Sequence, residues 1–305
     1  MPYYLGIDGG GTKTTCAVGD DARLLAAATS GPSNIVRVGE AQTRESLMQA
    51  VLQACAAAGI RPEQVVRTCV GGAGAARPEM AAIVRRILSE ILASPIDVMG
   101  DMEIALEAAF GDHPGVVVNA GTGSFAYGRN DVDQILRAGG WGFEIGDEGS
   151  AHWIGRAAIS TVLRASDRDG DRCASSPLAK ALCKTWGVSS LLDLARAANS
   201  IPPPDFAALF PAVAATDDEL AREVLGKAGR ELGDVAAVVI RRLFGEDEHG
   251  SVPVAMIGGV FRHAALVREA FYNELQLVAS RAQVMPQVVD PVEGALRMAR
   301  KAAKR

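Results

Sequence analysis

A carboxylate, three glycines, a lysine and three threonines stand together near the start of the sequence, in Asp8-Gly9-Gly10-Gly11-Thr12-Lys13-Thr14-Thr15. The apolar run Tyr3–Ile7 ahead of them predicts a buried strand that ends at the carboxylate. Glycines let backbone N–H groups approach an anion closely, Thr12 and Thr15 add donors, and Asp8 can hold a hydrated Mg²⁺ beside phosphates. The stretch therefore favours binding of a phosphate chain.

Two familiar phosphate motifs do not fit these glycines. A Walker A loop needs Gly-Lys-Thr in succession, and here Thr12 stands between Gly11 and Lys13. The Rossmann fingerprint needs a helix after its glycines, whereas Thr14–Gly19 predicts a second strand. The glycines therefore form a turn inside a hairpin, and a tight turn without any ligand is the alternative, because glycine turns are common.

Composition sets the class of protein. The chain has 305 residues, of which 49% are hydrophobic and 22% charged, enough for two ordinary globular domains. A net charge of −5 gives no basic field for nucleic acid, and no apolar run approaches the roughly 18 residues of a membrane span. Because the N-terminus enters a strand directly, no secretory signal is expected and a cytoplasmic location is predicted.

Cysteine and histidine show no spacing typical of a metal site. No two cysteines form a CxxC pair, and the histidines form no HExxH motif. The cysteines are therefore expected to be small, buried and reduced, and no metal site built from these residue types is predicted. The residues are Cys16, Cys55, Cys69, Cys173, Cys183, His113, His152, His249 and His263.

The order of predicted elements occurs twice along the chain. Each half gives three strands, then helices alternating with two more strands, and each has a glycine turn between its first two strands. The pattern predicts two βββαβαβα units whose mixed sheets face each other across a cleft. Predicted strands are Tyr3–Ile7, Thr15–Val18, Arg23–Ala28, Val65–Val70, Pro95–Met99, Gly115–Asn119, Phe125–Gly128, Gln134–Ala138, Val252–Ile257 and Gln283–Val289; predicted helices are Glu40–Ala58, Pro78–Leu92, Met102–Phe110, His152–Leu163, Asp217–Leu243, Phe261–Leu277 and Pro291–Lys304.

Six motifs spread over the chain resemble those of the N-acetylglucosamine kinase branch of the BadF/BadG/BcrA/BcrD ATPases, within the sugar kinase, hsp70 and actin superfamily. They are Gly6-Ile7-Asp8-Gly9-Gly10-Gly11-Thr12-Lys13-Thr14, Asn119-Ala120-Gly121-Thr122-Gly123-Ser124, Gly139-Gly140-Trp141-Gly142, Gly146-Asp147-Glu148-Gly149-Ser150-Ala151, Ile257-Gly258-Gly259-Val260 and Glu293-Gly294-Ala295. The resemblance implies two ribonuclease H-like (actin-like ATPase) domains with an interdomain cleft. The N-terminal domain, 1–114, would carry the sugar side, and the C-terminal domain, 115–305, the nucleotide side. The second domain would hold a helical insertion at about 175–244, and its last helix, 291–304, could pack back on the first domain.

The same resemblance implies ATP and Mg²⁺ as cofactors. The two glycine turns would clamp the triphosphate from opposite domains, and Asp8 would reach Mg²⁺ through water. The residues expected to bind ATP are Gly10, Gly11, Thr12, Lys13, Thr122, Gly258, Gly259, Gly294 and Ala295. The structural alternative for Lys13 is a solvated turn lysine. For Gly258, Gly259, Gly294 and Ala295 it is tight strand–helix packing.

Asp101 would be the general base that takes the sugar proton, and helix N-capping is its structural alternative. The sugar would be held by Asn34, Asp101, Gly123, Ser124, Gly140, Trp141 and Asp147. For Trp141 the commoner role is core packing, and for Asp147 it is helix-terminus electrostatics.

The resemblance implies an ATP-dependent kinase that phosphorylates the 6-hydroxyl of N-acetylglucosamine or glucosamine, and a homodimer is expected. N-acetylmuramic acid and glucose stay open as substrates. Two different functions also stay open: an ATPase activator of a benzoyl-CoA reductase or 2-hydroxyacyl-CoA dehydratase system, and a non-catalytic actin-like module. Activators of that kind share an iron–sulfur cluster between subunits, and the scattered cysteines show no matching ligand pattern.

Overall fold

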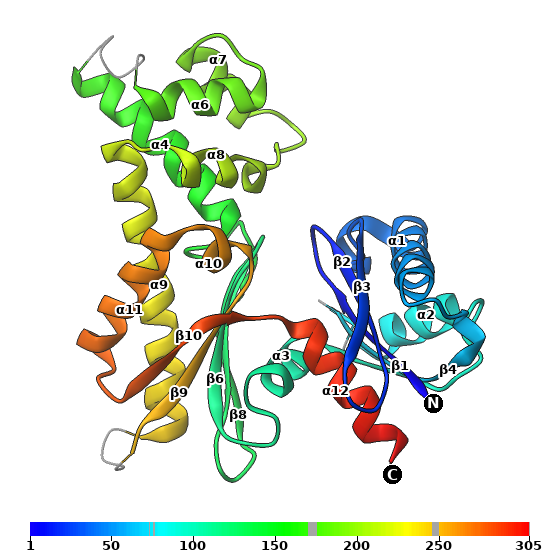
Figure 1. The fold of residues 1–305 in the computed structure, drawn as a ribbon. Coiled ribbons are helices and arrows are strands. Elements are labelled where there is room, and N and C mark those ends of the chain that lie inside the picture. Colours follow the sequence, from blue (N-terminus) through cyan, green and yellow to red (C-terminus); the bar gives the residue numbers. More distant parts are fainter. Residues whose placement is uncertain (73, 76, 170–175, 246–249, 305) are drawn as a thin grey trace. The chain divides into compact units, whose positions relative to one another are not determined.

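The computed structural model describes residues 1–305 apart from 73, 76, 170–175, 246–249 and 305. The described chain divides into two compact units (Figure 1). Unit 1 consists of Met1–His113 together with the returning C-terminal segment Val289–Arg305, and unit 2 consists of Pro114–Val288.

Unit 1 is built on a five-stranded sheet in the order β3-β2-β1-β4-β5. The first three strands are antiparallel neighbours, while β1, β4 and β5 run parallel. Parallel strands need crossovers, which the helices α1 and α2 supply. The strands are β1 (Tyr3–Gly9), β2 (Thr14–Gly19), β3 (Leu24–Ser30), β4 (Val65–Gly72) and β5 (Ile96–Gly100).

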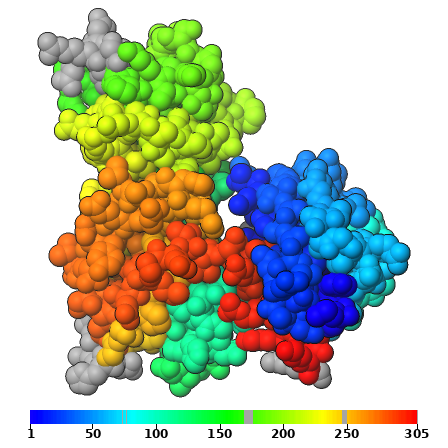
Figure 2. Space-filling view, viewed as in Figure 1, coloured from blue at the N-terminus to red at the C-terminus, as the bar shows by residue number. Residues whose placement is uncertain are grey.

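The helices of unit 1 cover both faces of this sheet. A core of aliphatic side chains from β1, β2, α1 and α2 fills one face, and a second core under α3 and α12 fills the other. The red C-terminal residues lie against the blue N-terminal ones in Figure 2, and α12 contacts β1. The helices are α1 (Ile35–Ala57), α2 (Pro78–Leu88), α3 (Asp101–Phe110) and α12 (Pro291–Ala303).

Unit 2 repeats the topology with the order β10-β9-β6-β7-β8. Strands β6, β7 and β8 form an antiparallel hairpin series, and β9 pairs with β6 in parallel. Position by position, β6 therefore corresponds to β1 and β9 to β4. The strands are β6 (Gly115–Ala120), β7 (Ser124–Arg129), β8 (Ile135–Gly139), β9 (Val252–Ile257) and β10 (Ala282–Val289).

A group of helices in unit 2 stands between its third and fourth strands. Helix α9 joins this group to the sheet, since it packs on β7 and β8 and against α11. The helices are α4 (Ala151–Asp169), α6 (Pro177–Trp186), α7 (Leu191–Ala198), α8 (Phe210–Ala215), α9 (Glu219–Phe244), α10 (Gly259–His263) and α11 (Ala265–Val278).

Several predicted helices have different limits in the structure. The helix that starts at Pro78 ends at Leu88 rather than Leu92, and the one predicted over His152–Leu163 runs over Ala151–Asp169. The first helix begins at Ile35 rather than Glu40, and Gly39 interrupts it with a φ of 76°. The helix predicted over Phe261–Leu277 is divided at Ala264, whose φ of −119° and ψ of 96° are extended. The α/β class with two mixed sheets is confirmed.

Among the described residues, no helix combines the length and the apolar character needed to cross a membrane.

Candidate functional site

The glycine turn of unit 1 is closed by its own backbone. The N–H of Gly10 donates to the carbonyl of Lys13 at 2.9 Å, so this amide serves the turn itself. The side chains of Thr12 and Lys13 are exposed beyond it. The turn therefore presents a hydroxyl and an ammonium group to solvent, beside glycine backbone that leaves room for a ligand.

Asn34 is tied to the same turn through the backbone. The N–H groups of Ser33 and Asn34 both donate to the carbonyl of Gly10, at 3.1 and 3.2 Å. The hydroxyl of Thr14 bonds to the carbonyl of Gly31 at 2.8 Å and to the hydroxyl of Ser33 at 2.7 Å. The predicted sugar ligand Asn34 and the predicted phosphate turn are thus one connected structure.

The side chain of Asn34 also caps helix α1. Its Oδ1 accepts the N–H of Arg37 at 3.3 Å, which satisfies one of the free amides at the helix start. Capping fixes the side chain of Asn34 beside the turn.

Strand register brings Asp8 and Asp101 to one edge of the sheet of unit 1. Gly9 pairs with Gly72, and Gly72 pairs with Gly100, so the three glycines form a row across the parallel strands. Asp8 precedes this row and Asp101 follows it. With two strand spacings between β1 and β5, the two backbones lie roughly 10 Å apart.

Asp101 is the first residue of α3, and Gly100 is the N-cap. The N-cap alternative for Asp101 is therefore wrong, although a carboxylate in the first helical turn still gains from the helix dipole. The residue is half-buried. Beside it, the carboxylate of Glu103 folds back over Gly100, and its Oε2 is buried without a hydrogen-bond partner among the residues that the structure describes.

The carboxyl of Asp8 has a pKa raised to about 7. Burial is the largest cause, followed by the negative charges of Asp101 and Asp290, while Lys13 opposes the shift. Asp290, the N-cap residue of α12, is therefore close enough to Asp8 for its charge to affect the pKa of Asp8. Sequence reasoning missed Asp290, although Asp290-Pro291 repeats the pattern of an acidic residue between a strand end and a helix start.

The surroundings of Asp8 suit a hydrated magnesium ion. No group of three or more His, Cys, Asp or Glu side chains forms a metal cage in the part of the chain that the structure describes. Magnesium in phosphate-transfer sites commonly uses one or two carboxylates, with water and phosphate oxygens as the other ligands. A cation would also offset the repulsion that raises the pKa of Asp8, so the donor set fits the ion.

The glycine turn of unit 2 is built like the first one. The N–H of Gly121 donates to the carbonyl of Gly123 at 2.9 Å. The start of α4 is attached to it, since the N–H of Ala151 donates to the carbonyl of Gly121 at 2.8 Å and that of His152 to the carbonyl of Thr122 at 3.4 Å. This turn is thereby fixed to the long helix that begins beside it.

Asp147 lies against the second turn. A side chain at Gly123 would place its Cβ 2.7 Å from Oδ2 of Asp147, so the carboxylate fills the space that the glycine leaves. Burial raises the pKa of Asp147, while the N–H groups of Gly142 and Ser124 donate to the carboxylate and oppose that rise. Its φ of 60° is uncommon for a residue with a side chain, and such strain is concentrated at functional sites.

The hydroxyl of Ser124, a predicted sugar contact, donates to the carbonyl of Glu148 at 2.6 Å. Its side chain is buried, so it braces the loop around Asp147. The structure thus brings together Gly123, Ser124 and Asp147, three members of the predicted sugar-binding set.

The loop after β8 carries Trp141 into solvent. Gly139, Gly140 and Gly142 all have positive φ values, between 68° and 98°, which only glycine adopts easily. Trp141 is 75% exposed, so core packing is excluded as its role. The guanidinium of Arg137 lies 6.0 Å from the ring centroid and donates to the carbonyl of Gly140, which anchors the loop.

Gly258 lies against the second turn. A Cβ there would lie 2.4 Å from the carbonyl oxygen of Ala120 and 3.0 Å from the nitrogen of Gly121, and its φ is 101°. Gly259 has open space where a Cβ would stand. Gly258 therefore packs closely on the predicted phosphate turn of unit 2, and Gly259 leaves open space next to it.

Gly294 and Ala295 have a different environment from the one predicted. Both lie on α12, which packs in unit 1, and Ala295 is 0% exposed within the core under α3. A Cβ at Gly294 would lie 1.9 Å from the carbonyl oxygen of Ile104. Close helix packing accounts for the small residues at both positions, and this favours packing over adenosine binding.

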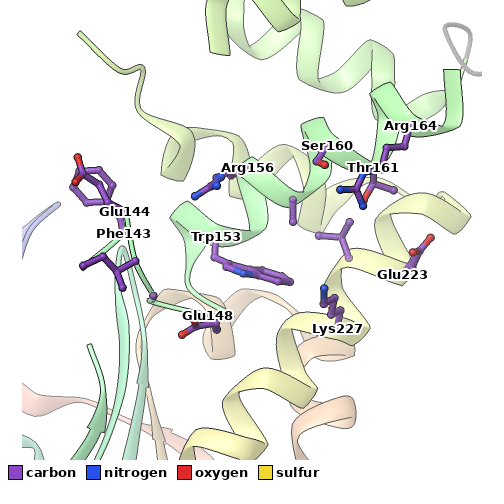
Figure 3. A pocket seen from close by; sticks show the side chains of 14 residues that line it. Phe143, Glu144, Glu148, Trp153, Arg156, Ser160, Thr161, Arg164, Glu223 and Lys227 are labelled. Atoms are coloured by element: carbon purple, nitrogen blue, oxygen red, sulfur yellow. The ribbon is translucent and has the colours of Figure 1, made fainter. Parts of the chain in front are cut away.

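A cavity of about 400 Å³ opens beside the loop 143–148 in unit 2. Figure 3 shows Trp153 at its centre with Lys227 next to it, and the ammonium lies 5.6 Å from the ring centroid. Arg156 and Arg164 of α4 and Glu223 of α9 line the rest. No local sequence pattern predicts this cavity, because its walls come from segments some 70 residues apart in sequence.

The described cysteines are packing residues. Cys16, Cys55 and Cys69 are buried and reduced in unit 1, and Cys183 is half-buried in unit 2. Burial raises the pKa of each thiol, which keeps it protonated and unreactive. Cys173 and His249 lie outside the described residues.

Two sheets of the same strand order, each with a glycine turn between its first two strands, define a protein of two ribonuclease H-like domains, as in the actin-like ATPases. The chain belongs to the BadF/BadG/BcrA/BcrD ATPase family, whose model matches residues 5–299.

Relatives along the whole chain are named as sugar kinases. An N-acetylmuramic acid/N-acetylglucosamine kinase from Clostridium acetobutylicum is 29% identical, with 98% of this chain and 99% of that protein covered. An N-acetyl-D-glucosamine kinase from Dictyostelium discoideum is 28% identical, with 97% of each chain covered. The solved structure of a candidate N-acetylglucosamine kinase from Chromobacterium violaceum has a TM-score of 0.75 and 27% identity, over 98% of this chain and 99% of that one.

Proposed function

We propose that the protein is an ATP-dependent amino-sugar kinase that transfers the γ-phosphoryl group to the 6-hydroxyl of N-acetylglucosamine, or of glucosamine. The observation that carries the proposal is the sharing of one sheet edge by Asp8 and Asp101 in unit 1. The full-length relatives named as kinases of N-acetylated amino sugars support the substrate class.

Asp101 is the proposed general base. In the reaction, the oxygen of the sugar hydroxyl forms a bond to the γ-phosphorus, the bond from that phosphorus to the bridging oxygen breaks, and ADP leaves. The hydroxyl proton passes to the carboxylate of Asp101. A base at the start of a short helix is rigidly held, and proton removal by such a group contributes about 10² to 10⁴-fold in rate.

The proposed sugar ligands come from both glycine-turn regions. Asn34 offers an amide nitrogen beside the first turn, and the buried carboxylate of Asp147 offers an acceptor beside the second. Trp141 adds a flat apolar surface that can lie against a sugar ring. In this proposal, the exposed residues Trp141 and Phe143 determine which substituent the loop accepts at carbon 2 of the sugar.

The proposed phosphate contacts are backbone amides and hydroxyls of the two turns, with Lys13 as a point charge. Phosphoryl transfer needs mainly positioned donors, because its transition state spreads charge over the phosphoryl oxygens. A magnesium ion bound near Asp8 through water would supply the neutralising charge. Gly258 and Gly259 are the proposed small-residue approach for the nucleoside.

We further propose a cytoplasmic homodimer. The homodimer is proposed because symmetric pairs are the commonest assemblies of soluble proteins.

A panel of sugars tests the proposed function. ATP consumption would be measured with N-acetylglucosamine, glucosamine, N-acetylmuramic acid and glucose, and the phosphorylated product would be located by ³¹P NMR. We expect consumption that depends on an amino sugar and a product phosphorylated on oxygen 6. ATP hydrolysis independent of all four sugars would instead favour the ATPase activator, and the absence of any turnover would favour a non-catalytic module.

A further inference from the structure

We propose that helix α12 sets the separation between Asp8 and Asp101, with Gly6 and Gly294 as positioning residues at its two contacts. The inference rests on the proposed function, because it concerns the geometry of the proposed base and the proposed magnesium carboxylate. Neither glycine is assigned a substrate contact, and both act through the elements that carry the carboxylates.

On the strand side, α12 lies directly on the backbone of β1. A Cβ at Gly6 would stand 2.3 Å from the nitrogen of Leu296 and 2.7 Å from the carbonyl oxygen of Val292. Ordinary contacts of a Cβ are 3.4 to 4 Å. Only glycine therefore allows this approach, and Asp8 follows Gly6 by two residues on the same strand.

On the helix side, α12 lies directly on the backbone of α3. A Cβ at Gly294 would stand 1.9 Å from the carbonyl oxygen of Ile104 and 2.7 Å from the nitrogen of Ala108. Ile104 is one helical turn beyond Asp101. The contact therefore fixes the part of α3 that carries the proposed base.

Polar contacts hold the other end of α3 to the same helix. Lys301 donates to Glu107 at 3.0 Å and to Asp112 at 3.1 Å, and Arg297 donates to the carbonyl of Glu107 at 2.7 Å. Glu107 is buried, so its charge depends on Lys301 for compensation. The two helices are thus fixed at both ends of their crossing.

The sheet completes the arrangement. The side chain of Ile104 lies over β4, where a Cβ at Gly71 would stand 2.3 Å from it. Helix α3 is therefore confined between β4 and α12, and α12 between α3 and β1. A close-packed interior transmits small displacements instead of absorbing them. A larger side chain at either contact of α12 must therefore move β1 or α3, and with it Asp8 or Asp101.

Gly294→Ala is the direct test. To reach the shortest ordinary contact distance, the new methyl group must push α3 away from α12 by about 1.5 Å. A displacement of about 1 Å at a reacting group can cost about 10²-fold in rate. We expect kcat to fall by about 10²-fold, with the KM for sugar and for ATP changed less than about threefold, since the proposed ligands other than Asp101 lie outside α3.

Gly229→Ala is the matched control. Gly229 lies on α9, and a Cβ there would stand 2.5 Å from the carbonyl oxygen of Val267 on α11 in unit 2. Gly229→Ala should lower the thermal stability of the protein, as Gly294→Ala does, but should leave kcat near the wild-type value. Should Gly294→Ala fail to fold, Lys301→Gln loosens the same crossing without a clash, and it should lower kcat by about tenfold with both KM values retained.

A crystal structure of each variant gives a readout independent of turnover. We expect the Asp8 to Asp101 distance to change in Gly294→Ala and to stay at the wild-type value in Gly229→Ala. An unchanged distance, or wild-type kcat in both Gly294→Ala and Lys301→Gln, overturns the inference. If the wild type phosphorylates no sugar, the proposed function fails by itself, and the crystallographic distance still decides the inference.

Discussion

Replacing Asp8 by asparagine is expected to stabilise unit 1 at alkaline pH in metal-free solution. Burial and the charges of Asp101 and Asp290 raise the pKa of Asp8 from 3.8 to about 7 in the folded protein. The pKa of Asp8 is higher in the folded protein than in the unfolded chain. Its protonation therefore contributes fully to the free energy of unfolding below about pH 4, and this contribution is lost as the pH rises through about 7. At pH 8, the ionised carboxylate of Asp8 therefore lowers the free energy of unfolding by about 4 kcal/mol at most.

The assay is urea unfolding at pH 5 and pH 8 with a metal chelator present. All three tryptophans, Trp141, Trp153 and Trp186, lie in unit 2, so their fluorescence follows that unit, while circular dichroism follows both. The wild type should lose about 2 to 3 kcal/mol of unfolding free energy in unit 1 between the two pH values. Asp8→Asn should lose little.

Asp131→Asn is the control for this experiment, because it removes an exposed carboxylate from a loop of unit 2. It should keep the wild-type pH dependence of unit 1. If Asp8→Asn and the wild type gave parallel stability curves from pH 5 to pH 8, the three carboxylates would not interact as described, and the proposed magnesium position would lose its electrostatic basis.

Three further substitutions have distinct expected outcomes. Trp141→Ala should change unfolding free energy by less than about 0.5 kcal/mol, because the ring is exposed, yet raise the sugar KM; an unchanged KM would remove this residue from the site. Asp147→Asn should raise the sugar KM at least about tenfold through loss of charge-assisted bonds, with the ATP KM as the control. Gly258→Ala should lower the stability of unit 2 by about 1 to 3 kcal/mol in tryptophan-monitored unfolding, and a neutral result would contradict its strained backbone.

The succession of strands along the chain and both glycine turns could be predicted from the sequence, because each depends on local signals. Alternating and apolar runs identify strands, and glycines with hydroxyls identify the turns. The positions of Asp8 and Asp101 at one edge also follow, since parallel strands that end in Gly9, Gly72 and Gly100 share that edge. These are consequences of short segments and of one rule of sheet geometry.

Contacts between distant segments could not be predicted from local signals. Asp290 approaches Asp8 because the C-terminal helix returns to unit 1, a return that only the family resemblance suggested and that nothing local in Asp290-Pro291 indicates. The same return explains why Gly294 and Ala295 pack against α3. Ala264 interrupts a helix that was predicted to be continuous, because apolar periodicity reports which side chains face the core and not the backbone angle at one residue.

The central claim is that Asp101 takes the proton of a sugar hydroxyl during phosphoryl transfer. The most direct test compares the wild type with Asp101→Asn, using ³¹P NMR of the phosphorylated amino sugar for turnover and calorimetry for nucleotide binding. We predict a fall in kcat of about 10²-fold or more in Asp101→Asn, with ATP affinity retained. Turnover near the wild-type rate in that variant would contradict the claim.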